Sequence, residues 1–350
     1  MHTNLSISSP LDNKQAQRAE KFDGWKINPS AKDNEIKRPY ERYEFSREIR
    51  SKLAPCFQID NWHCFLQVGE DWLAIALACG CSIWAWQNLA FFLALPIYLI
   101  AVTIIGARQR GLRVNNHQAT HKALAKNKVL NYIMGSFLSG YLALESFSGY
   151  NASHSAHHRY TGDGQRDSDL IDIIKHGLYG EERTARVKRY LVQIPLHIPR
   201  YIQYLLQNRI WNIEEDKQER LVKLTYLAVL SAIILYCGWG VELLIYWIVP
   251  LLTTANWFGT FIELSEHYPM MQTAPKVDIY MSRNRLLSPF LNFFMGTHQE
   301  NMHLVHHLFA GIPMWRLTEA HHILMEDSTY ATLNQEKGLG NLVKQIVTDE

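Results

Sequence analysis

Three short motifs bring together eight of the 16 histidines in the chain. The first motif is an H-x-x-x-H, and the second and third are both H-x-x-H-H. On a helix, residues at positions i, i+3 and i+4 lie on one side, so each motif can turn its imidazoles toward a common site. The motifs comprise His117 and His121, then His154, His157 and His158, then His303, His306 and His307.

Packing several imidazoles together is costly, because burial removes their hydration and protonation makes them repel one another. A bound cation removes both costs, so we expect these eight histidines to be metal ligands. The first motif alone is weak evidence, since surface histidines often have this spacing. The prediction of metal ligands therefore rests mainly on the two copies of H-x-x-H-H.

The number of ligands indicates two metal ions, because one zinc ion takes about four protein ligands. Imidazole suits iron, zinc, copper and nickel, so the residue type alone does not choose the metal. A histidine-rich iron pair would suit O₂ activation, whereas zinc would suit hydrolysis.

Two long apolar blocks must position these motifs. One runs from Trp72 to Ala107 without a charged residue, and the other runs from Leu224 to Ile262 with only Glu242 inside. Each is long enough for two spans of about 20 residues. We expect turns at 87–88 and at 238–240. Buried helices of a large soluble protein are the alternative, but residues that are apolar all around the helix favour a membrane.

Basic residues flank the open ends of both blocks and are absent from the expected turns. By the positive-inside rule, both helix pairs then open toward the cytoplasm. The apolar segment 129–150 is rich in glycine and serine, and we expect an interfacial or re-entrant helix there, because a span would separate the histidine motifs. The flanking basic residues are Arg108, Arg110, Arg113, Lys217, Arg220 and Lys223.

The sequence thus predicts an all-α integral membrane protein with four transmembrane helices in two hairpins. A cytoplasmic helical cap would carry the histidine motifs. We expect a polar, partly disordered N-terminal region at 1–65, a membrane domain at 66–325 and a C-terminal tail at 326–350. A formal net charge of +2 gives no reason to expect a nucleic-acid partner.

The flanks of the motifs resemble those of the membrane fatty acid desaturase superfamily, which also contains hydroxylases and ketolases. The resemblance rests on His157–Gly162 with Arg166–Asp169 after it, and on His303–Phe309 with Pro313 beyond. The segment Ser265–Pro269, which reads S-E-H-Y-P, is similar to a bacterial branch that includes rhizobitoxine- and rhizopine-type enzymes. The resemblance covers residues 70 to 325.

The resemblance implies a further ligand between the last span and the third motif, and His267 is the best placed. Acyl-CoA desaturases have an asparagine four residues before this histidine, where this chain has Glu263. Glu263 is therefore a candidate to bind iron, to act through water or to orient His267. His298 is a second candidate ligand.

Three aspartates, Asp163, Asp167 and Asp169, follow the second motif closely. We expect one or two of them to accept hydrogen bonds from ligand imidazoles, which would make those imidazoles more basic. A solvated acidic turn is the alternative. His321 and His322 have no third partner nearby in the sequence, and we expect them on a surface helix.

The resemblance implies two non-haem irons that use O₂ to desaturate or hydroxylate an unactivated C–H of a fatty-acyl or lipid-like substrate. An amino-acid-derived natural product or a carotenoid is the alternative substrate, and a zinc-dependent membrane hydrolase is the alternative enzyme. A metal transporter is disfavoured, because the expected spans carry no central charge. The bacterial flank implies the inner membrane, with the site facing the cytoplasm.

The chain has no motif for an electron carrier of its own, neither clustered C-x-x-C nor G-x-G-x-x-G. An external ferredoxin or cytochrome with its reductase is therefore implied. The basic segment Arg183–Arg189 is a candidate dock for an acidic carrier, although a solvated or headgroup-facing surface explains it as well.

Overall fold

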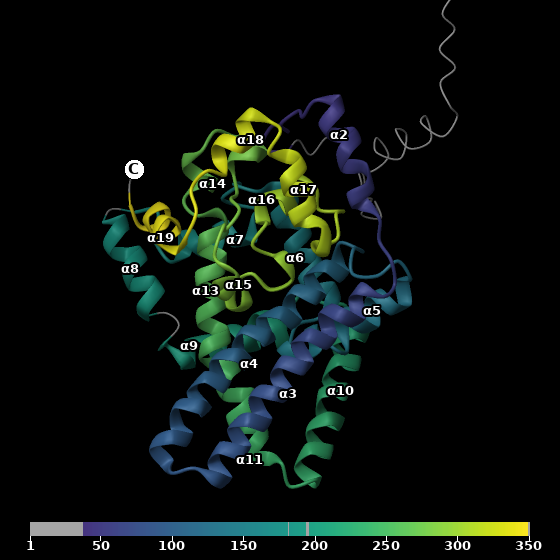
Figure 1. The fold of residues 1–350 in the computed structure, drawn as a ribbon, viewed down its shortest axis with the longest axis vertical. Helices are drawn as coiled ribbons and strands as arrows, with labels where there is room; N and C mark the ends of the chain where they lie inside the picture. The colour runs from purple at the N-terminus through teal and green to yellow at the C-terminus, as the bar shows by residue number, and fades with distance from the viewer. Residues whose placement is uncertain (1–37, 181, 194–195, 349–350) are drawn as a thin grey trace, which may run out of the picture.

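The computed structural model describes residues 38–180, 182–193 and 196–348. Within these residues the chain is helical and contains no strand; one isolated bridge joins Glu41 to Val277. Long helices extend to one end of the molecule, and shorter helices gather at the other end (Figure 1). The all-α prediction is thus confirmed for the described part of the chain.

Three helices in the described residues are long and apolar enough to cross a membrane. They are α3 (His63–Asn88), α4 (Phe91–Thr120) and the continuous stretch Gly240–Thr273. The turn between α3 and α4 lies at 89–90, next to the expected position. The third stretch is built from α11 (Gly240–Leu243), the π-helical turn η5 (Leu244–Ile248), α12 (Val249–Leu252), α13 (Thr254–His267) and α14 (Met270–Thr273).

The fourth expected span corresponds to α10 (Lys217–Tyr236), which does not have the composition of the other three. Its first two turns carry Lys217, Glu219, Arg220 and Lys223. Asp216 caps this end by accepting hydrogen bonds from the next backbone N–H groups, a typical helix start. The apolar part of α10 is therefore shorter than the helix itself.

Helix α4 is the centre of the fold, and two glycines let its neighbours approach closely. A Cβ at Gly111 would lie 2.5 Å from Asp71 Oδ1 on α3. A Cβ at Gly106 would collide with Thr254 at the start of α13. Larger side chains at these positions would push α3 and α13 away from α4, which carries the first histidine motif.

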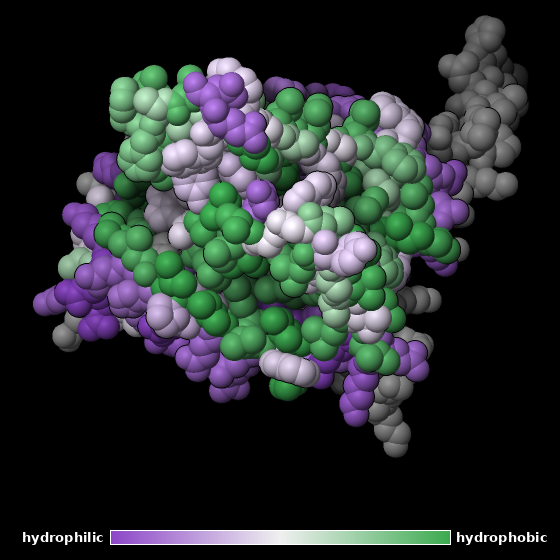
Figure 2. Space-filling view, turned by 90° about the horizontal axis from the view of Figure 1, so that it is seen from below, coloured by the Kyte–Doolittle hydropathy of each residue, from purple (hydrophilic) through white to green (hydrophobic). Residues whose placement is uncertain are grey.

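Large apolar side chains point outward from the long helices. In Figure 2, which looks onto the end of these helices, apolar residues dominate the face and hydrophilic residues lie mostly toward its edge. Phe92 on α4 is 71% exposed and Leu73 on α3 is 61% exposed. Such a surface is unusual for a protein in water and suits a lipid environment.

An upper layer of short helices precedes α10. The segment 129–150 is broken into pieces too short to span a membrane, as expected. These elements are α5 (Lys128–Ser136), η2 (Gly140–Ala143), α6 (Phe147–Tyr160), α7 (Ser168–Lys175), α8 (Arg183–Gln193), α9 (Ile198–Leu205) and the π-helical turn η4 (Leu206–Ile210).

The C-terminal part completes the upper layer. Its last helix packs against α8 and α13, and Ile346 is fully buried there. These elements are η6 (Asp278–Tyr280), α15 (Pro289–Met295), η7 (Thr297–Gln299), α16 (His303–Leu308), η8 (Met314–Arg316), α17 (Leu317–Leu324), α18 (Ser328–Leu333) and α19 (Leu339–Val347).

The described part of the N-terminal region is folded onto this layer. Residues 1–37 of the region expected to be partly disordered lie outside the described residues. Beyond them, α2 (Arg47–Leu53) and η1 (Ala54–Phe57) bury Leu53 and Cys56 in one apolar cluster with Leu304 and Val305 of α16. This stretch therefore supports the third histidine motif.

Candidate metal centre

Nine histidines converge in two groups inside the upper layer. In each group, one ring nitrogen of every histidine lies within 4.8 Å of the corresponding nitrogen of the others. These nine are the eight motif histidines together with His267. The five-histidine group contains His117, His121, His154, His158 and His306, and the four-histidine group contains His157, His267, His303 and His307.

The two H-x-x-H-H motifs divide their side chains between the groups. On α6, His154 and His158 point into the five-histidine group and His157 points into the other. On α16 the division is reversed, since His306 joins the five-histidine group while His303 and His307 join the other. Each motif thus gives an i, i+4 pair to one group and its i+3 residue to the second.

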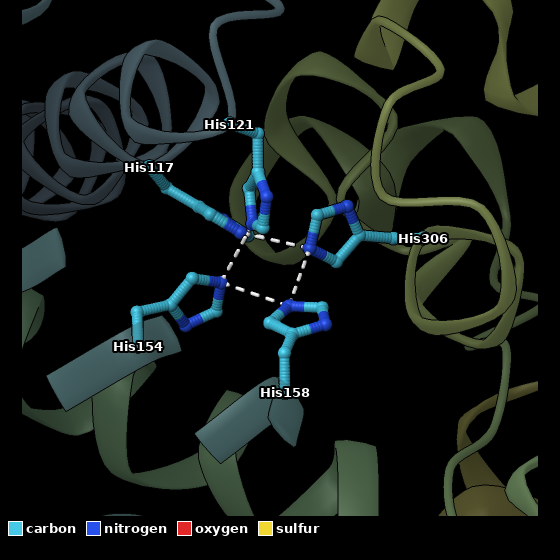
Figure 3. A group of neighbouring side chains, drawn as sticks. All are labelled: His117, His121, His154, His158 and His306. Atoms are coloured by element: carbon cyan, nitrogen blue, oxygen red, sulfur yellow. Dashed lines mark hydrogen bonds between the residues drawn. The ribbon is translucent and has the colours of Figure 1, made fainter. Parts of the chain in front are cut away.

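In the five-histidine group the Nε2 atoms form a chain of close contacts (Figure 3). His154 Nε2 lies 3.0 Å from both His121 Nε2 and His158 Nε2. His306 Nε2 lies 3.1 Å from His158 Nε2 and 2.9 Å from His117 Nε2. An imidazole nitrogen carries one proton or one lone pair, so one hydrogen bond satisfies it. Nitrogens that face two others each are better explained by a shared cation.

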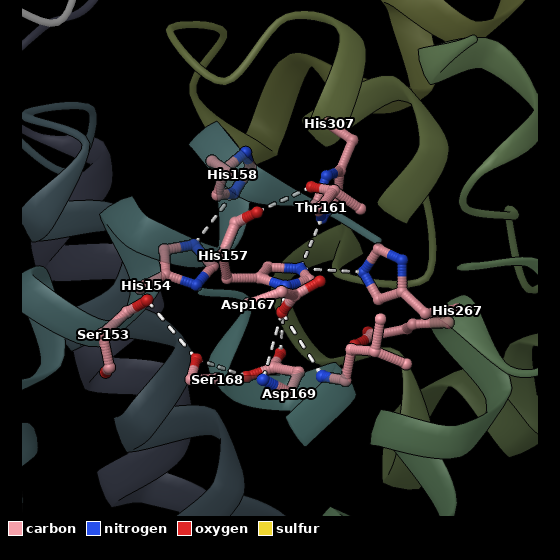
Figure 4. Close-up of polar contacts among 12 residues, drawn as sticks. Ser153, His154, His157, His158, Thr161, Asp167, Ser168, Asp169, His267 and His307 are labelled. Carbon is pink, nitrogen blue, oxygen red and sulfur yellow. Dashed lines mark hydrogen bonds and ion pairs between the residues drawn. The ribbon is translucent and has the colours of Figure 1, made fainter. Parts of the chain in front are cut away.

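The Nε2 atoms of the four-histidine group are also in close contact with one another (Figure 4). His267 Nε2 lies 3.1 Å from His157 Nε2 and 2.9 Å from His303 Nε2. His157 Nε2 also lies 3.3 Å from His307 Nε2. Imidazoles bound at about 2.1 Å to one ion and at right angles to each other have nitrogens about 3.0 Å apart. The spacing in both groups fits metal ligation.

The surroundings keep most of these imidazoles neutral, which is the form that binds metals. Burial lowers the pKa of His121 to about 4. Burial and the neighbouring imidazoles lower the pKa of His154 and of His158 well below the usual value. His307 behaves in the same way in the other group.

His157 is the exception, because acidic residues surround its Nδ1 atom. Asp167 Oδ1 lies 2.8 Å from it and Asp169 Oδ2 lies 3.5 Å away. Burial opposes the charged form, but the two carboxylates outweigh it and raise the pKa of His157 to about 9. Asp167 also caps α7 and accepts the Gly162 N–H, so its position is fixed. A carboxylate held in this way orients the imidazole and increases its basicity.

Two other contacts orient the four-histidine group. His267 Nδ1 lies 2.9 Å from the Met281 carbonyl oxygen, so the proton on Nδ1 leaves Nε2 free to bind. His303 Nδ1 lies 3.3 Å from Glu266 Oε1, which is 3.1 Å from Arg285. Sequence reasoning missed Glu266, although its place beside His267 in the S-E-H segment was an available signal.

The remaining candidates lie outside both groups. Glu263 is exposed, and it belongs to neither group. His298 Nε2 lies 2.8 Å from Asp71 Oδ2, so this histidine pairs with a buried carboxylate of α3. Asp163 holds Arg166 and the local turn, as a solvated acidic turn would. Of the three aspartates, Asp167 and Asp169 face an imidazole and Asp163 does not.

The prediction for His321 is wrong. His321 is buried at 7% exposure, and its Nδ1 lies 2.8 Å from the Tyr330 hydroxyl. Its neighbour His322 is exposed, as expected for a surface helix. Successive residues of a helix point about 100° apart, so His321 faces Tyr330 while His322 faces outward.

The sequence profile of the family described as Fatty acid desaturase matches residues 90–336, which includes both histidine groups. The chain belongs to the fatty acid desaturase family. It is therefore an oxidoreductase of the desaturase type. The zinc-dependent hydrolase considered from the sequence has no counterpart among the relatives below.

Several desaturases of known activity are similar to the chain over most of its length. The dihydrorhizobitoxine desaturase of Bradyrhizobium elkanii is 34% identical over 88% of this chain and 86% of its own length. The sn-1 oleoyl-lipid 12-desaturase of Anabaena variabilis is 24% identical over 91% of this chain and 93% of its own. The sn-1 acyl-lipid omega-3 desaturase (ferredoxin) of Nostoc sp. (strain 36) is 23% identical over 84% and 83%. The resemblance to the rhizobitoxine branch is thus confirmed.

Proposed function

We propose that this chain is a membrane-bound non-haem di-iron desaturase that uses O₂ to oxidise an unactivated C–H. The observation that carries the proposal is the pair of converging histidine groups in a chain of the desaturase family. The five-histidine group would hold one iron and the four-histidine group the other. Bound iron supplies the reduction of O₂ and the removal of hydrogen from carbon.

The protein residues supply position and protonation state. The imidazoles of the five-histidine group stay neutral because they are buried beside one another. Asp167 and the Met281 carbonyl fix the rings of His157 and His267, so their Nε2 atoms face inward before any metal arrives. No residue near the groups needs to act as a base on the C–H bond.

We place the long helices in the inner membrane of a bacterium, with the upper layer in the cytoplasm. The apolar outer surface of α3, α4 and α10 supports this placement. In it, α10 is the fourth span, whose charged first turns lie at the headgroups where Lys217 and Arg220 are favoured. The two hairpins are then α3–α4 and α10–α13.

The first candidate substrate is an amino-acid-derived natural product, because the 34% identical relative is named for dihydrorhizobitoxine. A fatty-acyl lipid is the second candidate, favoured by the acyl-lipid desaturases among the relatives.

The electrons would come from an external ferredoxin or cytochrome with its reductase. One of the relatives carries ferredoxin in its name. No residues for a flavin or an iron–sulfur cluster are evident in this sequence.

Product analysis tests the proposed function. The chain would be expressed in a bacterial host with a ferredoxin and its reductase, next to a His157→Ala control. Polar metabolites and membrane lipids would be compared by mass spectrometry. We expect a product two hydrogens lighter than its precursor, found only with the active protein. A hydrolysed product in place of an oxidised one would contradict the proposal.

A further inference from the structure

A basic cleft of about 540 Å³ opens between α7, α8 and α9, outside the histidine groups. It is lined by four basic side chains and by one carboxylate, Glu182. Two histidines, His176 and His197, also line it. The four basic residues are Lys175, Arg186, Arg189 and Arg200.

These basic side chains are not neutralised within the described part of the chain. No carboxylate there forms an ion pair with Lys175, Arg186, Arg189 or Arg200. Arg200 Nη2 lies 3.3 Å from His176 Nε2, which is a neutral partner for it. The Arg186 guanidinium lies against Gly177, where a Cβ would be 2.7 Å from Nη1. Four clustered cations beside a single carboxylate favour an anionic ligand.

The cleft lies where a bilayer surface is expected. Apolar side chains on the same helices and the adjoining segment point to the outside: Val192 is 63% exposed and Leu196 is 71% exposed. Figure 1 shows α8 and α9 beside α13, at the level where the long helices meet the upper layer. Apolar residues on one side of a helix and cations on the other are typical of an interfacial position.

Helix α7 links the cleft to the metal centre. Tyr190 lines it and lies within electrostatic range of Glu263 and Asp172. Lys175 ends helix α7, whose N-terminal cap Asp167 holds His157. A ligand whose charged end sits in the cleft could therefore extend past Tyr190 toward the histidine groups.

We propose that this cleft binds the carboxylate or phosphate of an amphiphile whose chain lies at the membrane surface. That the amphiphile is the substrate rests on the proposed function; the anion site itself does not. A phospholipid headgroup is the other source of the same chemistry, and the experiment below separates the two.

Binding would be measured on the full chain in phosphatidylcholine nanodiscs by calorimetry. The probes share one alkyl chain: octyl phosphate, octanoate, octylamine and octanol. We expect octyl phosphate and octanoate to bind, more weakly at high salt, while octylamine and octanol do not. Equal binding of octylamine would overturn the proposal.

Two neighbouring variants localise the site. Arg189→Gln removes a charge from the cleft, whereas Lys188→Gln removes the same charge from an exposed position of α8 that does not line it. We expect Arg189→Gln to weaken octyl phosphate binding about tenfold and Lys188→Gln to change it less than about twofold. Equal effects of the two changes would overturn the proposal.

Competition with an anionic lipid distinguishes the two possible occupants of the cleft. If phosphatidylglycerol in the nanodiscs blocks octyl phosphate, the occupant is a lipid headgroup. If it does not, and Arg189→Gln raises KM without changing kcat, the occupant is the substrate.

Bound metal is measured in the same samples and should be equal in all of them. Loss of bound metal would contradict the proposed function. Failure of both octyl phosphate and octanoate to bind would contradict the anion site in the cleft.

Discussion

The two histidine groups differ in what contacts the side of each imidazole that faces away from the metal site. Behind the four-histidine group, Asp167, Glu266 and the Met281 carbonyl contact the Nδ1 atoms of three ligands. Behind the five-histidine group, ring packing is the prominent contact, as in the stacking of His154 on Tyr150 with centroids 5.0 Å apart. Contacts to Nδ1 orient three ligands of the four-histidine group, and ring packing contributes to the five-histidine group.

This difference has a consequence for the metal ions. Negative groups behind a ligand increase its basicity and stabilise a more highly charged metal. The five-histidine group has one more imidazole, and therefore one more candidate ligand. We therefore expect the two sites to lose their metals under different substitutions.

Loss of one ligand should have the largest effect. His157→Ala should empty the four-histidine group and leave about one metal per chain, and His154→Ala should do the reverse. Each change should lower turnover by more than about 100-fold, beyond the usual effect of a residue that only supports a ligand. Elemental analysis and turnover check this. His322→Ala, at an exposed position, serves as the control; full metal content in His157→Ala would contradict the partition.

A smaller effect is expected from the carboxylate behind His157. Asp167→Asn should lower metal affinity at the four-histidine group by about 10- to 100-fold and leave the five-histidine group unchanged. Asparagine is also a good helix cap, so α7 should remain folded. Titration with a chelator measures the two affinities. Asp163→Asn, at a neighbouring exposed turn, should leave both as they are, and an equal loss in that variant would refute the role of Asp167.

Glu266 should matter less than Asp167, because its contact with His303 is longer, at 3.3 Å, and is shared with Arg285. Glu266→Gln should weaken metal binding at the four-histidine group by no more than about tenfold. The same chelator titration ranks the two variants, with the exposed Glu326→Gln as control. A larger loss than in Asp167→Asn would reverse the order given to the two carboxylates.

The smallest effect tests a buried histidine that belongs to neither group. Burial lowers the pKa of His321 to about 4. Between that value and about 6.5, the unfolded chain binds a proton at this position and the folded chain does not, so stability falls as the pH falls. The loss at pH 5 should be about 2 kcal/mol.

Melting temperatures at pH 7 and pH 5 measure this loss. His321→Gln should lose less stability on acidification than the unaltered protein does. His322→Gln should still lose stability on acidification, but slightly less than the unaltered protein, because the neighbouring His322 also lowers the pKa of His321. The same pH dependence in all three proteins would mean that His321 does not contribute.

The positions of the ligands along the chain could be predicted, but their division between two sites could not. The spacing of His154, His157 and His158 fixes which rings share a helix face. Which face turns to which site depends on how α6 and α16 pack against α4 and α13, and no local pattern encodes that. His267 was found only through a family resemblance, since one histidine at the end of an apolar block has no local signature.

The other differences between prediction and structure also arise from contacts between residues that are far apart in the sequence. His298 pairs with Asp71, 227 positions away, and a contact so distant in the sequence leaves no motif. His321 is buried against Tyr330 of α18 and Asn284, and Asn284 lies 37 positions away in the sequence. The apolar blocks were easier to predict, because a membrane environment acts on composition alone.

The metal content of the purified chain tests the central claim most directly. Elemental analysis of active protein should give about two irons per chain, falling to about one in His157→Ala and in His154→Ala. Stoichiometric zinc in active protein, or full iron in either variant, would contradict the assignment of the two histidine groups to a di-iron centre.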